Sequence, residues 1–109
     1  MRMWMVDPRK MCDQHLLGEH VELHMLVGTL ARKRSVAGFV ANNLIEVHNV
    51  RSRHEELVGE MTRRGMNHQS PLPAFRAARL GKVSIRANLV ELARRCDSCR
   101  AKQIRRPRA

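Results

Sequence analysis

Residues 12–24, CDQHLLGEHVELH, bring together side chains that can accept or donate protons. If this segment is helical, His15 and Glu22 are seven residues apart and share one face, and Glu19 lies four residues after His15. A carboxylate on such a face can accept a proton or stabilise a developing positive charge on a substrate. The spacing therefore indicates a candidate catalytic surface, although a helical Glu is often only a solvated partner for a neighbouring cation.

The balance of charge favours a polyanionic partner. The 109 residues carry 21 Lys and Arg against 10 Asp and Glu, for a net charge of +11, and 17 of the cations are Arg. Arg binds phosphates in a bidentate manner and stays charged, which suits contact with a nucleic-acid backbone. A solvated basic face is the alternative. A membrane surface is disfavoured because no basic amphipathic helix with a strong apolar face stands out.

Length and composition predict one all-α domain. A chain of 109 residues with 43% hydrophobic residues can build a single core. No apolar run is long enough to cross a membrane, and no secretion signal is evident. Three cysteines, an odd number, argue against a disulfide framework, so we expect a cytoplasmic protein. We expect it to be a monomer.

The pattern of apolar residues and caps predicts about three helices after an extended N-terminal arm. The arm covers residues 1–9, with Pro8 near a helix start, and a long helix follows over 9–32. Ser52 with Glu55 forms a capping box, and Gly65 is suited to the C′ position of that helix. The remaining expectations are a basic turn over 32–38, an ambiguous stretch over 39–50, a loop over 66–73, a helix over 85–99 capped by Ser84, a single domain over 1–103 and a disordered basic tail over 104–109.

The same patterns predict which side chains are buried. The stripe expected on the first helix consists of Met11, Leu16, Leu17, Val21, Leu23, Met25, Leu26 and Leu30. The later helices are expected to bury Leu57, Val58 and Met61, and then Ile85, Leu89, Leu92 and Cys96.

Two further patterns could bind a metal ion. His20 and His24 are spaced i, i+4, which allows chelation, but the segment is not HExxH, and a solvated or DNA-facing pair is the favoured interpretation. Cys96 and Cys99 form a CxxC.

Cys12 is a possible third ligand for the CxxC, and His15 or His68 a possible fourth. Half a zinc site is a weak match, so thiols in the core or at the surface are the favoured interpretation.

Residues 12–23, with Met1-Arg2 and the segment RSRHEELVGEMTRRGMNHQSPL, resemble the pyrimidine-dimer DNA glycosylases of the endonuclease V type from phages and bacteria. The resemblance covers residues 1–73. It implies that an N-terminal α-amine attacks C1′ of the damaged nucleotide, forms a Schiff base and nicks the strand by β-elimination. The resemblance puts the nucleophile at Met1, the essential carboxylate at Glu22 and a phosphate-binding cation at Arg2.

An N-terminal amine suits this chemistry. A free α-amine has a reference pKa of about 7.7–8.0 against about 10.4 for lysine, so about 10–17% of it is neutral at pH 7. Residue 2 is Arg, which is too bulky for the aminopeptidase that removes Met before small residues. We therefore predict that the retained, deformylated Met1 supplies the amine.

The resemblance also suggests DNA contacts. Gln14 and His15 match the QH pair of the family and are expected at the site edge or on a phosphate. The arginines that flank the family's glutamate are replaced by Val21 and Met25. Other cations must then bind phosphate, and we expect these to be Arg32, Lys33, Arg34, Arg63 and Arg64. Trp4 either stacks at an extruded base or anchors the arm.

We therefore predict a glycosylase with abasic-site lyase activity on double-stranded DNA, without a metal or organic cofactor. A buried base is out of reach, so a nucleotide must be flipped or the duplex kinked. No aromatic residue follows Phe75, where the family has an aromatic segment, so the lesion stays open. The alternatives are a non-enzymatic DNA-binding protein of the same fold and a zinc-dependent nuclease using Cys12, Cys96, Cys99 or the His20/His24 pair.

Overall fold

The computed structural model describes residues 1–67 and 70–104, in which the regular elements are helices and no strand is present. The all-α prediction is confirmed, although the helices are more numerous than the three expected. The elements are η1 (Pro8–Lys10), α1 (Asp13–Ala31), α2 (Ala37–Ala41), η2 (Val47–Asn49), α3 (Val50–Arg63), α4 (Ile85–Arg95) and α5 (Asp97–Ile104), where η denotes a 3-10 helix. The expected disordered tail covers 104–109, but Ile104 is the last residue of α5, and residues 105–109 lie outside the described part of the chain. No helix within the described ranges is long and apolar enough to span a membrane.

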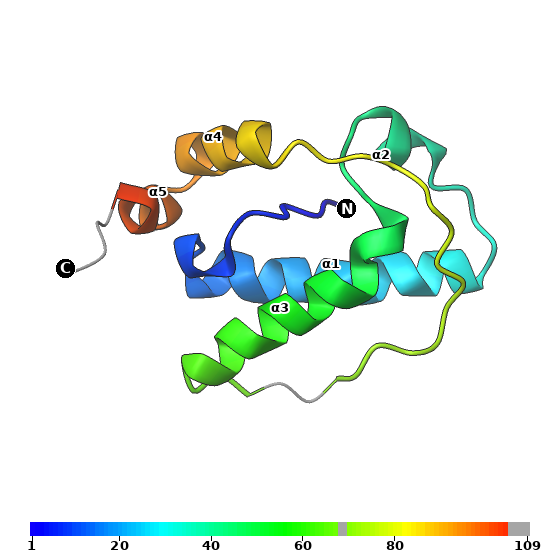
Figure 1. Ribbon diagram of the computed structural model, residues 1–109, viewed down its shortest axis with the longest axis horizontal. Coiled ribbons are helices and arrows are strands. Elements are labelled where there is room, and N and C mark those ends of the chain that lie inside the picture. The colour runs from blue at the N-terminus through cyan, green and yellow to red at the C-terminus, as the bar shows by residue number, and fades with distance from the viewer. Residues whose placement is uncertain (68–69, 105–109) are drawn as a thin grey trace.

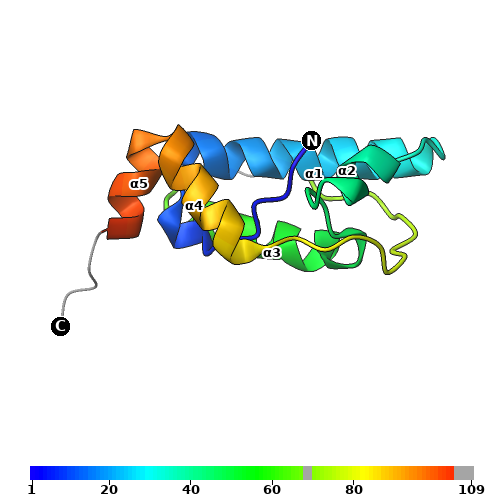
Figure 2. The same ribbon diagram turned by 90° about the horizontal axis from the view of Figure 1, so that it is seen from above.

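The helices enclose the N-terminal arm, residues 1–7. Helices α1 and α3 pack against each other, and α4 and α5 lie on the other side of the arm (Figures 1 and 2). Residues 64–67 and 70–84, in the long connection from α3 to α4, are non-helical and run around the molecule (Figure 1). The arm is therefore an interior element and not a frayed end.

The arm is extended, as predicted, and its backbone is bound on both sides. Met3, Trp4 and Val6 are buried. The Met3 N–H donates to the Leu44 carbonyl at 2.7 Å, and the Asn88 side-chain amide donates to the carbonyls of Met3 at 3.2 Å and Trp4 at 2.9 Å. Because a buried backbone group without a partner is costly, these bonds fix the register of the arm between the helices.

A buried ion pair joins α1, α3 and the arm. Arg53 and Glu19 are 0% and 1% exposed. Arg53 donates to both carboxylate oxygens of Glu19, at 2.6 and 2.8 Å, and its third nitrogen donates to the Val6 carbonyl at 2.7 Å. The Arg53 guanidinium, on α3, therefore satisfies hydrogen-bond acceptors on α1 and on the arm and links the three segments.

Helix α1 begins later than expected. Pro8 starts η1, with the Asp7 carboxylate accepting from the Arg9 N–H, and the chain is extended again at Met11 and Cys12. The Cys12 sulfur then caps α1 by accepting from the His15 N–H. Helical periodicity alone could not distinguish the separate 3-10 helix η1 from the beginning of α1.

Only part of the predicted α1 stripe is buried. Leu16, Leu23 and Leu26 are fully buried, as expected, whereas Leu17, Val21 and Met25 are 45–56% exposed. The arm and α3 cover one side of α1, and the broad stripe extends beyond that side.

Helix α3 begins at Val50, so the predicted Ser52 cap is wrong. Ser52 lies inside the first turn, and its hydroxyl donates to the Asn49 carbonyl at 3.1 Å. The preceding η2 turn already starts the helical path, which leaves no place for a cap at Ser52. The other end is as predicted: Gly65 follows the helix with φ +75°, a conformation that favours glycine. Leu57 and Met61 are buried, and Val58 is half-buried.

The helix predicted over 85–99 is two helices. Ser84 caps α4 as predicted, with its hydroxyl accepting from the Ala87 N–H at 3.2 Å. The chain then becomes extended at Cys96, and α5 starts at Asp97. Leu92 is buried, but Ile85 is 53% exposed and Asn88 is buried instead, because α4 packs on polar backbone groups of the arm.

We predict that replacing Arg53 alone lowers the free energy of unfolding more than replacing both Arg53 and Glu19. Arg53→Met leaves the Glu19 carboxylate buried without its partner, and we expect a loss of about 3–5 kcal/mol in the free energy of unfolding by urea. The double variant Arg53→Met, Glu19→Leu should lose clearly less. A double variant as unstable as the single one would contradict this account of the pair.

We also predict an acid-sensitive contribution from Glu60. Hydrogen bonds from Arg63 and then Arg64 lower the pKa of this buried carboxyl to about 2. The folded pKa lies below the unfolded value of about 4.3, so the stabilisation is present above that value and is lost as the pH falls towards 2.

Because Arg63 is exposed, we expect this contribution to be only about 1–2 kcal/mol. In Glu60→Gln, the fall in the free energy of unfolding between pH 5 and pH 2 should be smaller by this amount. Glu55→Gln, on the exposed side of α3, should keep the wild-type pH dependence. Equal curves for both variants would refute the role of Glu60.

Candidate active site

One pocket gathers six of the residues that the sequence singled out. It lies where the arm passes between α1 and α4, and its volume is about 390 Å³. The lining residues are Arg2, Trp4, Gln14, His15, Gly18, Glu19, Glu22 and Arg95. The expected shared face of His15, Glu19 and Glu22 on α1 is therefore one wall of this pocket.

Glu22 is bound to the start of the chain. Its Oε2 accepts the backbone N–H of Arg2 at 3.1 Å, so the carboxylate lies one residue from the α-amine of Met1. Met1 itself is half-buried and packs against the core, and it is not among the residues that line the pocket. The arrangement brings the carboxylate close to the amine and leaves the amine at the pocket's margin.

The two carboxylates of the wall have different surroundings. Glu19 is fully buried, and Arg53 binds both of its oxygens from below the pocket. Glu22 is half-buried and carries the amide contact to Arg2. Glu19 is therefore held by a buried cation, whereas Glu22 is bound to the backbone of the arm.

Arg2 and Trp4 form the arm's side of the pocket. The Arg2 guanidinium lies 4.1 Å from the centre of the Trp4 ring and donates to the side-chain amide oxygen of Asn88 at 2.7 Å. Its Nε is buried and has no hydrogen-bond partner in the described part of the chain. Burial, with the neighbouring Arg95, lowers the pKa of Arg2 from its usual value, although a guanidinium still remains charged.

Trp4 is an anchor whose ring also borders the pocket. It is 6% exposed, and its carbonyl is held by Asn88. The ring meets His15 edge-on, with 6.1 Å between ring centres. The structure thus supports the anchoring alternative for Trp4.

Arg95, at the end of α4, is a pocket residue that the sequence analysis missed. Its guanidinium lies 5.8 Å from the Trp4 ring centre, and its Nε donates to Glu91 at 2.6 Å. With Arg2 it gives the pocket two cations around one aromatic ring. The RR pair at 94–95 was the available signal, but nothing in the sequence indicated that this end of α4 reaches the arm.

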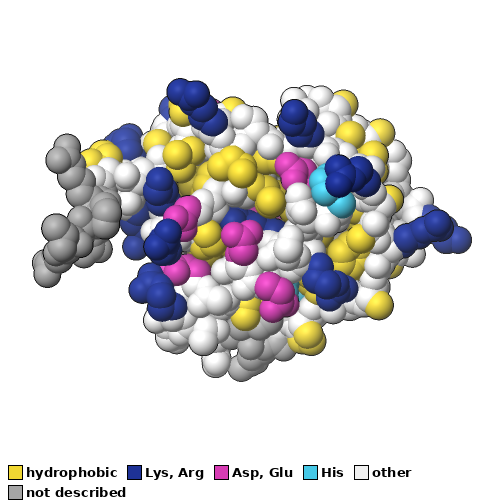
Figure 3. Space-filling model, in the orientation of Figure 1, with side chains coloured by type: hydrophobic (Ala, Val, Ile, Leu, Met, Phe, Trp, Pro, Cys, Tyr) yellow, Lys and Arg dark blue, Asp and Glu magenta, His cyan; other side chains and the backbone are white. Residues whose placement is uncertain are grey.

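The other predicted phosphate contacts lie away from the pocket. Arg32, Lys33 and Arg34 are exposed beyond the far end of α1, about 20 Å along the helix from Gly18. Figure 3 shows Lys and Arg side chains spread around the rim of one face, with acidic side chains among them. Arg32, Lys33 and Arg34 can therefore contact only those parts of a long ligand that extend beyond the pocket.

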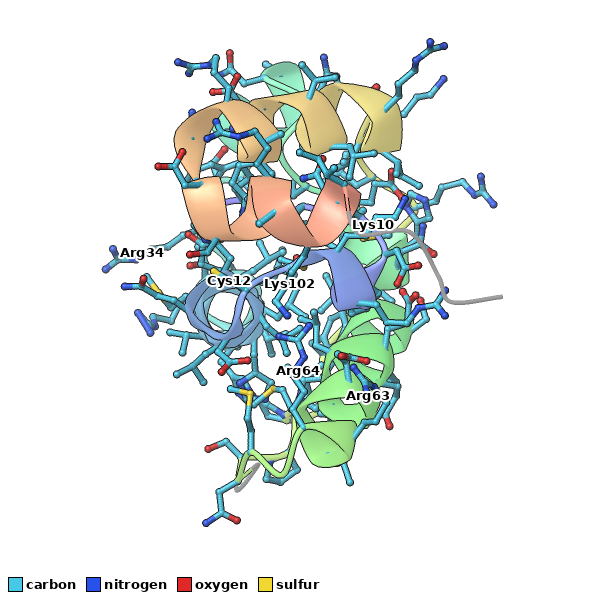
Figure 4. The ribbon with its side chains drawn as sticks, turned by 90° about the vertical axis from the view of Figure 1, so that its left-hand side faces the viewer. Lys10, Cys12, Arg34, Arg63, Arg64 and Lys102 are labelled. Atoms are coloured by element: carbon cyan, nitrogen blue, oxygen red, sulfur yellow. The ribbon has the colours of Figure 1, made fainter. Side chains whose placement is uncertain are left out.

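Arg63 and Arg64 lie beside α3 on the other side of α1 from α4 and α5 (Figure 4). Arg63 is exposed and paired with Glu60. Arg64 is largely buried and donates to Asp13 at 2.9 Å and to the carbonyls of Pro8 and Met11 at 3.0 and 2.8 Å. These bonds fasten η1 to α3, so the structure gives Arg64 a role in the fold.

Two clusters of metal-binding side chains are also present. Cys12, His15, Cys96 and Cys99 converge at the start of α1, and His20, His24 and His54 converge between α1 and α3. The expectation of a solvated His20/His24 pair is wrong, because His20 is buried and stacks with His54 at 5.0 Å between ring centres. His68, a possible zinc ligand from sequence, lies outside the described residues.

Comparison with known proteins gives one match. The model of a family described as pyrimidine dimer DNA glycosylase matches residues 1–74, which include the arm, α1, α3 and every pocket residue except Arg95. No curated protein and no solved structure matches the chain.

Proposed function

The chain belongs to the pyrimidine dimer DNA glycosylase family, and we propose that it excises a damaged base from double-stranded DNA through an imine formed by the Met1 amine. Membership supports an enzyme of the DNA glycosylase class with DNA as its substrate. The nucleophile, the lyase step and the residue roles are the proposal.

The contact between Glu22 and the Arg2 amide carries this proposal. The family resemblance implies a carboxylate that acts with the N-terminal amine. The Glu22 carboxylate accepts the first backbone N–H after that amine. A half-buried carboxylate at that place can take a proton from the amine and balance the positive charge that develops on the sugar. Arg53 holds Glu19, which leaves Glu22 for this role.

The reaction proceeds in two balanced steps. After losing a proton to Glu22, the neutral amine attacks C1′ and the bond from C1′ to the base breaks, with one amine proton going to the departing base. The bond from C1′ to O4′ then breaks to give an iminium, and the protonated Glu22 returns its proton to O4′. Loss of a proton from C2′ then breaks the C3′–O bond and releases the 3′ side of the strand with its phosphate. Hydrolysis of the imine restores the amine.

The pocket size and its cations support binding of one extruded nucleotide. About 390 Å³ is at the small end of sites that hold small molecules, which suits a nucleotide flipped from the duplex. Within the described residues the buried Nε of Arg2 has no hydrogen-bond partner, and Arg95 also lies near the Trp4 ring, so both can bind phosphates beside the lesion. Gln14 is exposed at the rim, and His15 faces Trp4.

A non-enzymatic DNA-binding protein is the second candidate. The observation in its favour is that Met1 packs against the core and does not line the pocket. For the enzyme, the amine must reach C1′ at the pocket's margin when DNA is bound.

We predict that sodium borohydride traps a covalent complex with a duplex that contains one abasic site, in the presence of EDTA. The chain beginning at Met1 should give the adduct, and a chain with extra N-terminal residues or an acetylated terminus should not. Glu22→Gln should lower the yield by about 100-fold, the range for loss of a general acid–base group, whereas Glu55→Gln should not. No adduct despite normal duplex binding in a mobility-shift assay would leave the DNA-binding candidate.

We predict that Arg95 contributes to DNA affinity and Arg94 does not. Both arginines pair with Glu91, but only Arg95 lines the pocket. Arg95→Gln should weaken binding of the abasic duplex and reduce the slope of log affinity against log salt by about 1, as for one lost phosphate contact. Arg94→Gln is the matched control, and equal effects of the two changes would exclude a special role for Arg95.

A further inference from the structure

Four ligand-type side chains from the two ends of the chain meet beside the pocket. Cys12 and His15 come from the start of α1, and Cys96 and Cys99 come from the junction of α4 and α5. Their ligand atoms all lie within 4.8 Å of one another. Figure 4, which looks at the N-terminal end of α1, shows Cys12 where that helix faces α4 and α5.

Three of the six distances within the cluster are close to the edges of a zinc tetrahedron. With Zn–S near 2.3 Å and Zn–N near 2.0 Å, tetrahedral geometry puts two sulfurs about 3.8 Å apart and a sulfur and a nitrogen about 3.5 Å apart. Cys12 Sγ lies 3.9 Å from Cys96 Sγ. His15 Nδ1 lies 3.3 Å from Cys12 Sγ and 3.6 Å from Cys99 Sγ.

The local backbone is arranged to receive thiolates. Cys12 is the N-cap of α1, with its sulfur accepting the His15 N–H at 3.5 Å, and the Cys96 sulfur accepts the Cys99 N–H at 3.4 Å at the start of α5. The Cys12 N–H donates to Cys99 Sγ at 3.2 Å. Amide donors at helix N-termini stabilise negative charge on sulfur, and such outer contacts orient metal ligands.

We propose that Cys12, His15, Cys96 and Cys99 bind one structural zinc ion. Binding converts three thiols and one neutral imidazole into a complex of net charge −1 and releases three protons for each Zn²⁺. Four protein ligands complete a tetrahedron and leave no position for water or substrate, which distinguishes this site from a catalytic zinc site. The soft thiolates favour zinc over magnesium or calcium.

The zinc ion fastens the C-terminal helices to the family-matched part of the chain. Residues 1–74 supply Cys12 and His15, and the segment beyond the match supplies Cys96 and Cys99. Arg95 immediately precedes Cys96, and His15 lines the pocket through its ring. The ion therefore sets the position of the α4 end that closes the pocket, and it takes no part in the imine chemistry proposed for Met1.

Cobalt replacement tests the site directly. The reduced protein should bind one Co²⁺ with a thiolate-to-cobalt charge-transfer band and the strong visible bands of a tetrahedral site, and one equivalent of Zn²⁺ should abolish both. Cys96→Ser and Cys99→Ser should weaken or remove the charge-transfer band. His24→Gln, in the separate cluster of three histidines, is the control and should retain it.

Thiol reactivity of the wild-type protein provides a second test, which does not depend on whether a serine variant folds. In the zinc-loaded wild type, all three cysteines should react with a thiol reagent more than 10-fold more slowly than after removal of the metal with a strong chelator under native conditions. Cobalt bound without a thiolate band, or equal thiol reactivity with and without zinc, would overturn the proposal.

Discussion

The position of the N-terminal arm depends on one buried guanidinium. Arg53 holds Glu19 of α1 through two bonds and the Val6 carbonyl through a third, with both charged side chains removed from water. Charges buried in this way are tolerated only when every donor and acceptor is matched, so the three segments can pack in one relative position. Asn88 then fixes the next part of the arm from the α4 side.

This constraint separates the two glutamates of α1. Glu19 and Glu22 are three residues apart and line the same pocket, but only Glu19 is held by a buried cation. Glu22 meets the first amide of the arm, which the arm's fixed register brings to it. A site built on the start of a chain needs this support, because chain ends are otherwise the most mobile part of a protein.

The sequence predicted those features that depend on neighbouring residues or that follow from the family resemblance. The helical spacing of His15, Glu19 and Glu22, the Ser84 cap and the terminating Gly65 are all present as predicted. Contacts across the whole chain were not predictable, because Asn88 and Arg95 reach the arm from more than 80 residues away. The Cys96 break was missed because its apolar spacing also fits a continuous helix, although Cys12-x-x-His15 and Cys96-x-x-Cys99 share one spacing. No signal distinguished Arg53, a buried cation, from the many exposed ones.

The central claim is that the fixed arm presents the Met1 amine as the nucleophile, and peptide mapping of the trapped DNA complex tests it most directly. After nuclease and protease digestion, mass spectrometry should find the reduced sugar remnant on the α-nitrogen of Met1. A remnant on a lysine side chain such as Lys10, with an unmodified N-terminal peptide, would contradict the account.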